Sequence, residues 1–358
     1  MSNRIEIKTE NLPYCFVISG NRLKYPVGKL PSKVLASLLD RNVINDKRVI
    51  VGPAIGEDAA VIDTGGPHYL IAKTDPITFA TDRIGWYAVN INANDIAAMG
   101  GRPQWFLATL LLPETRTGQG DVERIFEDIL ESCRNLGISL IGGHTEITHD
   151  LKRPILVGQM LGEVKKDKLV RTSGAQVGDV LIITKGIAVE GTAIIAREKA
   201  GDLKTLFDEE RLTRAQNFLY EPGISVLKDA LIAAEAAEIH SMHDPTEGGV
   251  ATGLHEIASA SRVGLVIDLK ALPIFSETRQ LCDHFGLDPL GLIASGALLI
   301  TCKPAAANRV LTRLQAEGIN AIAIGRIVQE QKGTKIQDAT GIRDLPIYEQ
   351  DEVTKILS

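Results

Sequence analysis

The sequence predicts an α/β protein of two domains, and three observations lead to this prediction. Its 358 residues exceed the length at which a single hydrophobic core usually stops growing. Helix-like and strand-like apolar patterns alternate along most of the chain. The segment 165–178 is charged and turn-rich, which makes it the candidate domain boundary. We therefore expect three parts, with the bounds 1–32, 33–165 and 172–345.

The first part, residues 1–32, is polar and turn-rich, which indicates an N-terminal extension rather than a domain. Beyond it, residues 32–40 have apolar positions at helical spacing behind a serine that can cap a helix. Gly137 follows a later helical pattern at the position where a left-handed residue usually ends a helix. In the first domain the patterns predict strands at 59–63, 69–75, 105–112 and 154–163, and helices at 85–99 and 121–136.

The second domain repeats this alternation. Its short apolar runs indicate buried strands, and longer periodic segments separate them. The patterns predict strands at 180–184, 264–268, 297–301 and 321–325, and helices at 188–200, 223–237, 248–261 and 304–317.

Composition excludes several classes of protein. The 44% hydrophobic and 23% charged residues are typical of a globular chain and exclude a disordered one. The 39 basic and 45 acidic residues give a net charge of −6, which argues against general nucleic-acid binding. The chain shows neither an apolar run of ~18 residues nor a signal-peptide pattern, so we expect no membrane association and a cytoplasmic location. Its 4 cysteines lie far apart, without a CxxC pair.

Two predicted strands of the first domain are flanked by aspartates. Asp58 follows Gly56 where a glycine-containing loop enters a strand. Asp75 lies where the next apolar strand is expected to end, since Pro76 prevents simple continuation of the ladder. An aspartate at a strand end is more often a turn residue than a ligand, so neither residue makes a site alone.

The helix predicted at 85–99 adds Asn94 and Asp95 on an otherwise apolar sequence. Several carboxylates brought together without a cation would repel one another, and hard oxygen ligands suit Mg²⁺, which often joins carboxylates to nucleotide phosphates. The usual nucleotide signatures, G-x-x-x-x-G-K-[ST] and G-x-G-x-x-G after a strand, are absent from the sequence. These residues therefore leave two interpretations, a metal and phosphate site or a set of solvated surface groups.

Glycine-containing turns supply further candidates. The diglycine Gly142–Gly143 is expected to form a turn, with Glu146 shortly after it. Asp244 precedes a second diglycine that leads into a helix, where exposed backbone N–H groups can hold an anion. Lys185 lies in a strand–turn–helix opening and is available to meet a phosphate. Each of these signals is weak alone, because glycine loops leading into helices are common.

Taken in order, these segments resemble one ATP-dependent superfamily over roughly residues 33–345. The resemblance is carried by G-E-D-A-A-V, K-T-D, N-D-I-A-A-M-G, G-G-H-T-E and H-D-P-T-E-G-G-V. They are similar to the aminoimidazole ribonucleotide (AIR) synthetase, or PurM-like, superfamily. It includes hydrogenase maturation protein HypE, selenophosphate synthetase and thiamine-monophosphate kinase. The HypE branch looks closest, because D-P-T-x-G-G followed by A-T-x-L-x-E-I-A is typical of it.

The resemblance implies an AIR synthase-like fold with ATP and Mg²⁺ as cofactors. The N-terminal α/β domain would pair its sheet across a homodimer, and the C-terminal α/β domain would pack beside it. By the same resemblance Asp244 would be catalytic, facing the reacting phosphoryl group. The implied metal ligands are Asp58, Asp75, Asp95 and Glu146. The implied nucleotide contacts are Gly56, Asp58, Asp75, Asn94, Asp95, Gly142, Gly143 and Lys185.

Two departures from the HypE pattern shape the expected activity. His144 stands where that branch has an aspartate in G-G-D-T, and Glu146 is the expected replacement. HypE ends in a cysteine that carries its carbamoyl substrate, whereas this sequence ends in Ser358 and its nearest cysteine is Cys302. We therefore expect ATP-dependent phosphorylation of a separate acceptor, either small or protein-borne and amide-type or other, with release of ADP. Hydrogenase or metal-cofactor maturation is the expected setting.

Three alternatives stay open at this stage. A thiamine-monophosphate kinase-like enzyme would share the carboxylates, but that branch has D-x-S-D-G where this chain has Asp244-Pro-Thr-Glu-Gly. A selenophosphate synthetase-like enzyme would use a cysteine near its N-terminus in a glycine-rich context, and Cys15 lies in no such context. A non-catalytic assembly factor would bind ATP and a partner without turnover.

Overall fold

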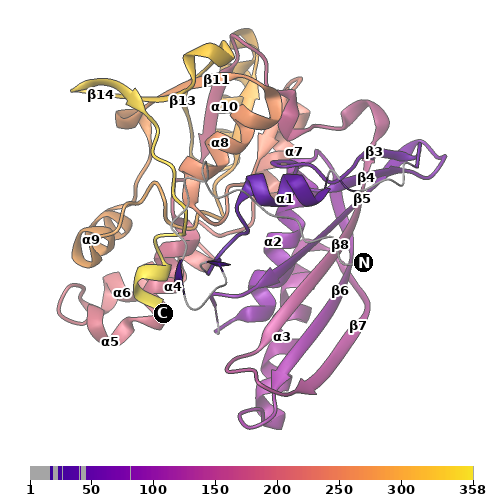
Figure 1. Ribbon diagram of the computed structural model, residues 1–358, viewed down its shortest axis with the longest axis vertical. Helices are drawn as coiled ribbons and strands as arrows, with labels where there is room; N and C mark the ends of the chain where they lie inside the picture. Colours follow the sequence, from indigo (N-terminus) through magenta and orange to yellow (C-terminus); the bar gives the residue numbers. More distant parts are fainter. Residues whose placement is uncertain are drawn as a thin grey trace.

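The computed structural model describes residues 17–18, 23–25, 27–39, 41, 46–80 and 82–357. These residues form two large sheets flanked by helices (Figure 1), together with a short pair of strands, β1 (Val17–Ile18) and β2 (Leu23–Lys24). Much of the predicted N-terminal extension, including Cys15, lies outside the described residues, as does Ser358. None of the described helices is both long and apolar enough to cross a membrane.

The first sheet has the strand order β3-β4-β5-β8-β6-β7. Its neighbouring strands are antiparallel except β6 and β7, which run parallel. The helix α3 ends where the sequence predicted, at Gly137, whose φ of 70° is the left-handed conformation that glycine adopts easily. The elements of this half are α1 (Ser32–Leu39), β3 (Val49–Val51), β4 (Ala60–Asp63), β5 (His68–Ile77), α2 (Ile84–Ala98), β6 (Arg102–Pro113), α3 (Gln119–Leu136), β7 (Ser139–Thr148) and β8 (Ile155–Lys165).

The second sheet has the order β10-β12-β9-β13-β11-β14-β15. Its interior strand β9 begins with a continuous apolar run, as expected for a strand covered on both faces. The strands are β9 (Val180–Thr184), β10 (Ser241–His243), β11 (Gly264–Asp268), β12 (Leu299–Cys302), β13 (Ala321–Val328), β14 (Thr334–Asp338) and β15 (Gly341–Asp344). The helices are α4 (Val189–Glu198), α5 (Ala200–Leu203), α6 (Glu209–Gln216), α7 (Leu227–Ala236), α8 (Gly249–Ser261), α9 (Ser276–Phe285), α10 (Pro304–Ala316) and α11 (Thr354–Leu357).

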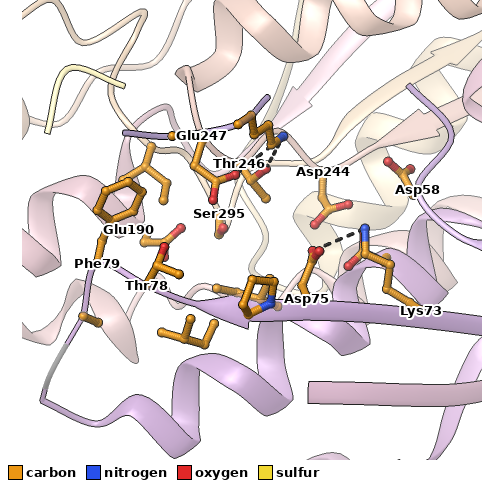
Figure 2. Close-up of a pocket in the computed structure, with 18 of the residues that line it drawn as sticks. Asp58, Lys73, Asp75, Thr78, Phe79, Glu190, Asp244, Thr246, Glu247 and Ser295 are labelled. Atoms are coloured by element: carbon orange, nitrogen blue, oxygen red, sulfur yellow. Dashed lines mark hydrogen bonds and ion pairs between the residues drawn. The ribbon is translucent and has the colours of Figure 1, made fainter. Parts of the chain in front are cut away.

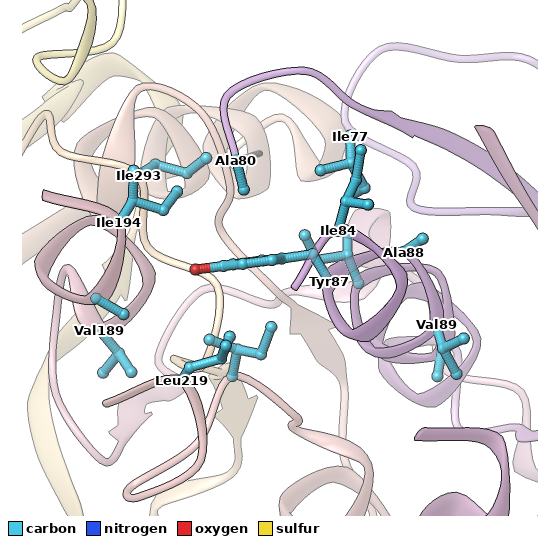
Figure 3. Packing of buried hydrophobic residues seen from close by; sticks show 14 of the residues in the cluster. Ile77, Ala80, Ile84, Tyr87, Ala88, Val89, Val189, Ile194, Leu219 and Ile293 are labelled. Carbon is cyan, nitrogen blue, oxygen red and sulfur yellow. The ribbon is translucent and has the colours of Figure 1, made fainter. Parts of the chain in front are cut away.

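Helix α2 joins the two halves, because it is buried on nearly every side. One face packs on the first sheet, and its last turn, Ala97 and Ala98, belongs to an apolar cluster of the second half. Nearer the start of α2, Tyr87 reaches toward Val189 and Ile194 of α4 (Figure 3). A helix shared in this way fixes the two halves against each other, and polar residues on α2 therefore face both of them.

Two sequence predictions about local structure were wrong. The diglycine Gly142–Gly143 does not form a turn but lies within strand β7. A Cβ at position 143 would come within 2.0 Å of the Ala108 carbonyl oxygen, so glycine is required there by close approach to β6. Strand β5 also continues past Pro76, because β4 pairs with β5 only as far as Ala72 and the proline needs no partner on that side.

Candidate functional site

A pocket of about 410 Å³ lies between the two halves of the molecule. The first half contributes the loop at Gly56, the end of β5 and Asp95 of α2, and the second half contributes the loop from His243 to Glu247. The segment 27–29, ahead of α1, also lines it. Figure 2 shows carboxylate side chains from these separate elements pointing into the same space.

Three aspartates form the centre of the pocket. Asp58, Asp95 and Asp244 each offer a carboxylate oxygen within 4.8 Å of the others, and all three are buried. Both oxygens of Asp244 and one of Asp95 have no hydrogen-bond partner among the described residues. Burial, with repulsion from Asp58, raises the pKa of Asp244 to about 8. Such a cluster of hard oxygen donors fits a divalent cation such as Mg²⁺.

Lys73 compensates part of this negative charge. Its Nζ lies 2.8 Å from Asp95 Oδ1 and 3.3 Å from Asp75 Oδ2, so one ammonium joins two predicted site residues. Burial lowers the pKa of Lys73, but the nearby Asp95 and Asp75 carboxylates raise it further, and the net pKa lies well above its usual range. The K-T-D segment contained this lysine, yet sequence reasoning gave a role only to Asp75. Asp75 lines the pocket beside the three-aspartate cluster.

A chain of charged groups holds Asp58 in place. The His243 ring is within hydrogen-bond distance of Asp58 through Nδ1 at 2.6 Å and of Glu256 through Nε2 at 2.8 Å. Burial lowers the pKa of His243, but these two carboxylates raise it well above its usual value, so the imidazolium donates to both. Thr172 donates to the other oxygen of Asp58, at 3.1 Å. The direction of the Asp58 carboxylate is therefore fixed from two sides.

Two predicted nucleotide contacts lie outside the described lining of the pocket. Asn94 is fully buried and joins α2 to the second half, where it donates to the Ile224 carbonyl and accepts from the Val226 N–H. Lys185 pairs with Asp229 at 3.4 Å and donates to the backbone carbonyl of Ser225. Both residues have hydrogen-bond partners within the protein, which explains their burial without a phosphate.

The predicted residues on β7 are also separate from this pocket. Gly142, Gly143 and Glu146 are exposed on β7, and Glu146 is within 3.2 Å of His144. In the described structure they do not join Asp58, Asp95 and Asp244 within one chain. The pocket thus brings together Gly56, Asp58, Asp75, Asp95 and Asp244 of the predicted set.

The second diglycine does bind an anion, but one that the chain supplies itself. The Gly248 N–H donates to the Asp351 carboxylate at 2.7 Å, at the start of α8. Gly248 and Gly249 have φ of 80° and 66°, and a Cβ at position 249 would lie 2.4 Å from the Leu290 carbonyl oxygen. The tight turn was predictable from the glycines, whereas its partner, 103 residues away, was not.

Comparison with known families matches both halves of the chain. Residues 56–164 match the model of the AIR synthase related protein N-terminal domain, and residues 176–337 match that of the C-terminal domain. A putative hydrogenase expression/formation protein of Methanocaldococcus jannaschii is 29% identical over 89% of this chain and 95% of its own. Carbamoyl dehydratase HypE of Rhizobium leguminosarum is 31% identical over 77% of this chain and 78% of its own.

Two further comparisons bear on the chemistry. Selenide, water dikinase of Aeromonas salmonicida is 32% identical over 70% of each chain. A crystal structure of hydrogenase maturation protein HypE in complex with ATP superposes with a TM-score of 0.68 and 25% identity, covering 84% of this chain and 92% of that one. The two segments matched by the family models include Gly56, Asp58, Asp75, Asp95 and Asp244 of the pocket.

Proposed function

Because the chain belongs to the AIR synthase related protein family, we propose that it transfers the γ-phosphoryl group of ATP to a separate acceptor, with Mg²⁺ as the metal. The family and the two-domain α/β fold that the sequence predicted are confirmed. The observation that carries the proposal is the buried cluster of Asp58, Asp95 and Asp244, whose unpartnered oxygens face the pocket. The likeness to HypE in complex with ATP supports the nucleotide.

Each charged group of the pocket has a distinct part in this proposal. Asp58 and Asp95 hold Mg²⁺, which neutralises phosphate charge when it is bound. Lys73 lies beside Asp75 and provides a fixed positive charge at the same place. Asp244 approaches from the second half and faces the reacting phosphoryl group, where its raised pKa of about 8 suits a proton acceptor near neutral pH.

The acceptor is expected to be a separate molecule and to be uncharged. The described cysteines, Cys133, Cys282 and Cys302, are buried, and none lies among the described residues of the pocket. Carboxylate side chains outnumber cationic ones eight to four among those residues, with the His243 imidazolium counted as a cation, which disfavours an anionic acceptor such as thiamine phosphate. The carbamoyl dehydratase relative favours an amide-type acceptor, and the hydrogenase expression/formation relative favours a place in hydrogenase or metal-cofactor maturation. We propose a cytoplasmic location for this activity.

We further propose that the enzyme is a homodimer formed through the first sheet. Strand β7 lies at the end of that sheet and exposes Ile141 and Ile147, which are 51% and 54% accessible. An exposed apolar edge strand is a site for pairing with another chain, and a second copy would supply matching residues. Such pairing would cover Gly142, Gly143 and Glu146. Sedimentation at micromolar concentration tests this, and a monomer would contradict it.

A selenide-dependent activity is the second candidate, supported by the 32% identity to a selenide, water dikinase. The experiment that separates the candidates combines ATP and Mg²⁺ with amides, thiamine phosphate or selenide in turn. Amide-dependent release of ADP is the expected result. Release of AMP with selenide would favour the dikinase reaction, and ATP binding without turnover in the whole panel would leave a non-catalytic assembly factor.

A further inference from the structure

The pocket continues beyond the carboxylate cluster into a second half. Figure 2 shows Thr78, Phe79, Glu190 and Ser295 on the side of the pocket away from Asp58 and Lys73. Ile293 also lines this part of the pocket. The second half therefore combines apolar surface with a few polar groups, which is typical of a site that binds a small molecule.

Glu190 and Ser295 are held together by the backbone at the start of α4. The Glu190 N–H donates to the Ser295 carbonyl at 3.3 Å, and the Gly191 N–H donates to the Ile293 carbonyl at 3.0 Å. These bonds fix the first turn of α4 against the segment 293–295. Glu190 is thus positioned by α4, and Ser295 by a turn that is hydrogen-bonded to the start of that helix.

One polar atom on each side chain of this pair lacks a hydrogen-bond partner among the described residues. Glu190 is 3% exposed and Ser295 is 0% exposed, and both line the pocket. The Glu190 Oε2 and the Ser295 Oγ make no hydrogen bond within the described residues. Burial of a polar atom without a partner is unfavourable, so two such atoms beside a cavity point to a ligand that completes their hydrogen bonds.

The charge state of Glu190 narrows the class of ligand. Burial raises its pKa to about 8, with further contributions from Glu247 and Asp351, while Ser295 opposes the rise. Near neutral pH the side chain is mostly a neutral carboxylic acid, which can both donate and accept a hydrogen bond. A ligand that carried a carboxylate or phosphate here would bring further negative charge into an acidic, poorly hydrated place.

We propose that Glu190 and Ser295 bind the phosphoryl acceptor and select for an uncharged amide group. This inference rests on the proposed phosphoryl transfer and adds the residues that determine acceptor specificity. An amide offers an N–H donor and a carbonyl acceptor. The neutral carboxylic acid of Glu190 and the hydroxyl of Ser295 can each donate and accept a hydrogen bond, so they can pair with both amide groups. Phe79 and Ile293 provide apolar contact for the rest of the molecule.

The test uses acetamide and acetate, two probes of similar shape that differ in charge. Binding is measured by saturation-transfer NMR on the full chain with Mg²⁺ and a non-hydrolysable ATP analogue. We expect the wild-type protein to bind acetamide and not acetate. Glu190→Ala and Ser295→Ala should each weaken acetamide binding by about 10-fold, the scale of one buried hydrogen bond, with nucleotide affinity unchanged within about 2-fold.

Two further variants test whether the loss of binding is specific to the hydrogen-bonding groups of the pocket. Glu190→Gln keeps a neutral hydrogen-bonding group and should retain acetamide binding within about 3-fold. Thr301→Val removes another buried, unpartnered hydroxyl that lies in β12 and outside the described pocket lining, and it should change nothing. Equal binding of acetate and acetamide, no acetamide binding to the wild type, or unchanged binding in both alanine variants would overturn the inference. Failure of Mg²⁺ and nucleotide to bind would instead overturn the proposed function.

Discussion

The carboxylate of Asp351 accepts a hydrogen bond from the backbone N–H of Gly248 at 2.7 Å, at the N-terminus of α8. The same carboxylate accepts from the Val353 N–H at 2.8 Å, so it also orders the short segment that leads into α11. The anion-binding property expected of a diglycine helix start is therefore satisfied by the chain itself. The diglycine turn therefore stabilises the fold, and our proposal places phosphate binding at the aspartate cluster with its metal.

Asp351→Ala should lower stability with little effect on nucleotide binding. Loss of an acceptor at a helix N-terminus costs about 1 kcal/mol, so we expect a lower melting temperature and ATP affinity within about 2-fold of wild type. Thermal unfolding and nucleotide titration measure the two effects separately. A large loss of ATP affinity at unchanged stability would indicate instead that the diglycine turn belongs to the phosphate-binding site.

Nucleotide binding should depend on the metal. We expect Mg²⁺ with ATP to raise the melting temperature and ATP with EDTA to raise it much less, because the acidic cluster repels an unneutralised triphosphate. Asp58→Asn should remove most of the metal-dependent rise in melting temperature. Asp128→Asn is the matched control, since Asp128 and Asp58 are both 6% exposed, but Asp128 pairs with Arg83 away from the pocket. Equal stabilisation with and without metal would contradict the site.

Replacing Lys73 should lower the stability of the metal-free protein and increase the stabilisation that Mg²⁺ produces. Lys73→Met leaves Asp75 and Asp95 without their ammonium partner, so we expect a loss of about 3 kcal/mol in the free energy of unfolding. Added Mg²⁺ should restore more stability to the variant than to the wild type, because the more negative cluster attracts the cation more strongly. Chemical unfolding across a Mg²⁺ titration measures this, and parallel Mg²⁺ responses of the two proteins would contradict it.

The buried carboxyl of Glu190 predicts a pH-dependent stability. Its folded-state pKa of about 8 lies above the ordinary 4.5. The stability that this group contributes is therefore fully present below the ordinary pKa and is lost as pH rises through about 8. Glu190→Gln cannot ionise, so it should be stabilised relative to wild type above pH 8 and by much less in mild acid. Melting curves across this range check the difference, which would be constant if Glu190 did not titrate there.

The sequence predicted those parts of the molecule that depend on local pattern. Helix α3 and its end at Gly137 follow from periodicity and one glycine. Asp58 and Asp75 could be noticed because they border predicted apolar strands, and Asp95 because it interrupts an apolar helix. Contacts between distant segments could not be predicted in this way. Lys185 follows a strand in the manner of a phosphate ligand, but the fold brings Asp229 beside it instead.

Glu190 was missed for a related reason. It lies in the first turn of α4, and the strand–turn–helix opening before it directed attention to Lys185 instead. Only burial, the absent partner of its Oε2 and the neighbouring Ser295 distinguish it from an ordinary helical glutamate. These properties come from packing between segments that are distant in the sequence, which periodicity along one segment does not contain.

Asp244 is the residue whose replacement separates catalysis from folding. A structural reading would make it a helix cap, but neither carboxylate oxygen accepts a hydrogen bond within the described residues. Capping would require one, so Asp244→Asn should not cost the ~1 kcal/mol of a lost cap. Since burial and repulsion from the neighbouring Asp58 raise its pKa, replacing the carboxyl with a neutral amide should leave the melting temperature unchanged or higher.

The same variant should lose turnover. With the carboxylate absent, the proton of the acceptor has no positioned base, and we expect ADP release to fall by roughly 10²-fold or more while ATP affinity stays within a few-fold. Asp58→Asn provides the contrast, because weaker Mg²⁺ and nucleotide binding is expected there. Steady-state rates, nucleotide titration and a melting curve on both variants decide the matter. Near-normal turnover of Asp244→Asn with a lowered melting temperature would assign Asp244 to the fold, because a positioned base cannot be removed without slowing the reaction that it serves.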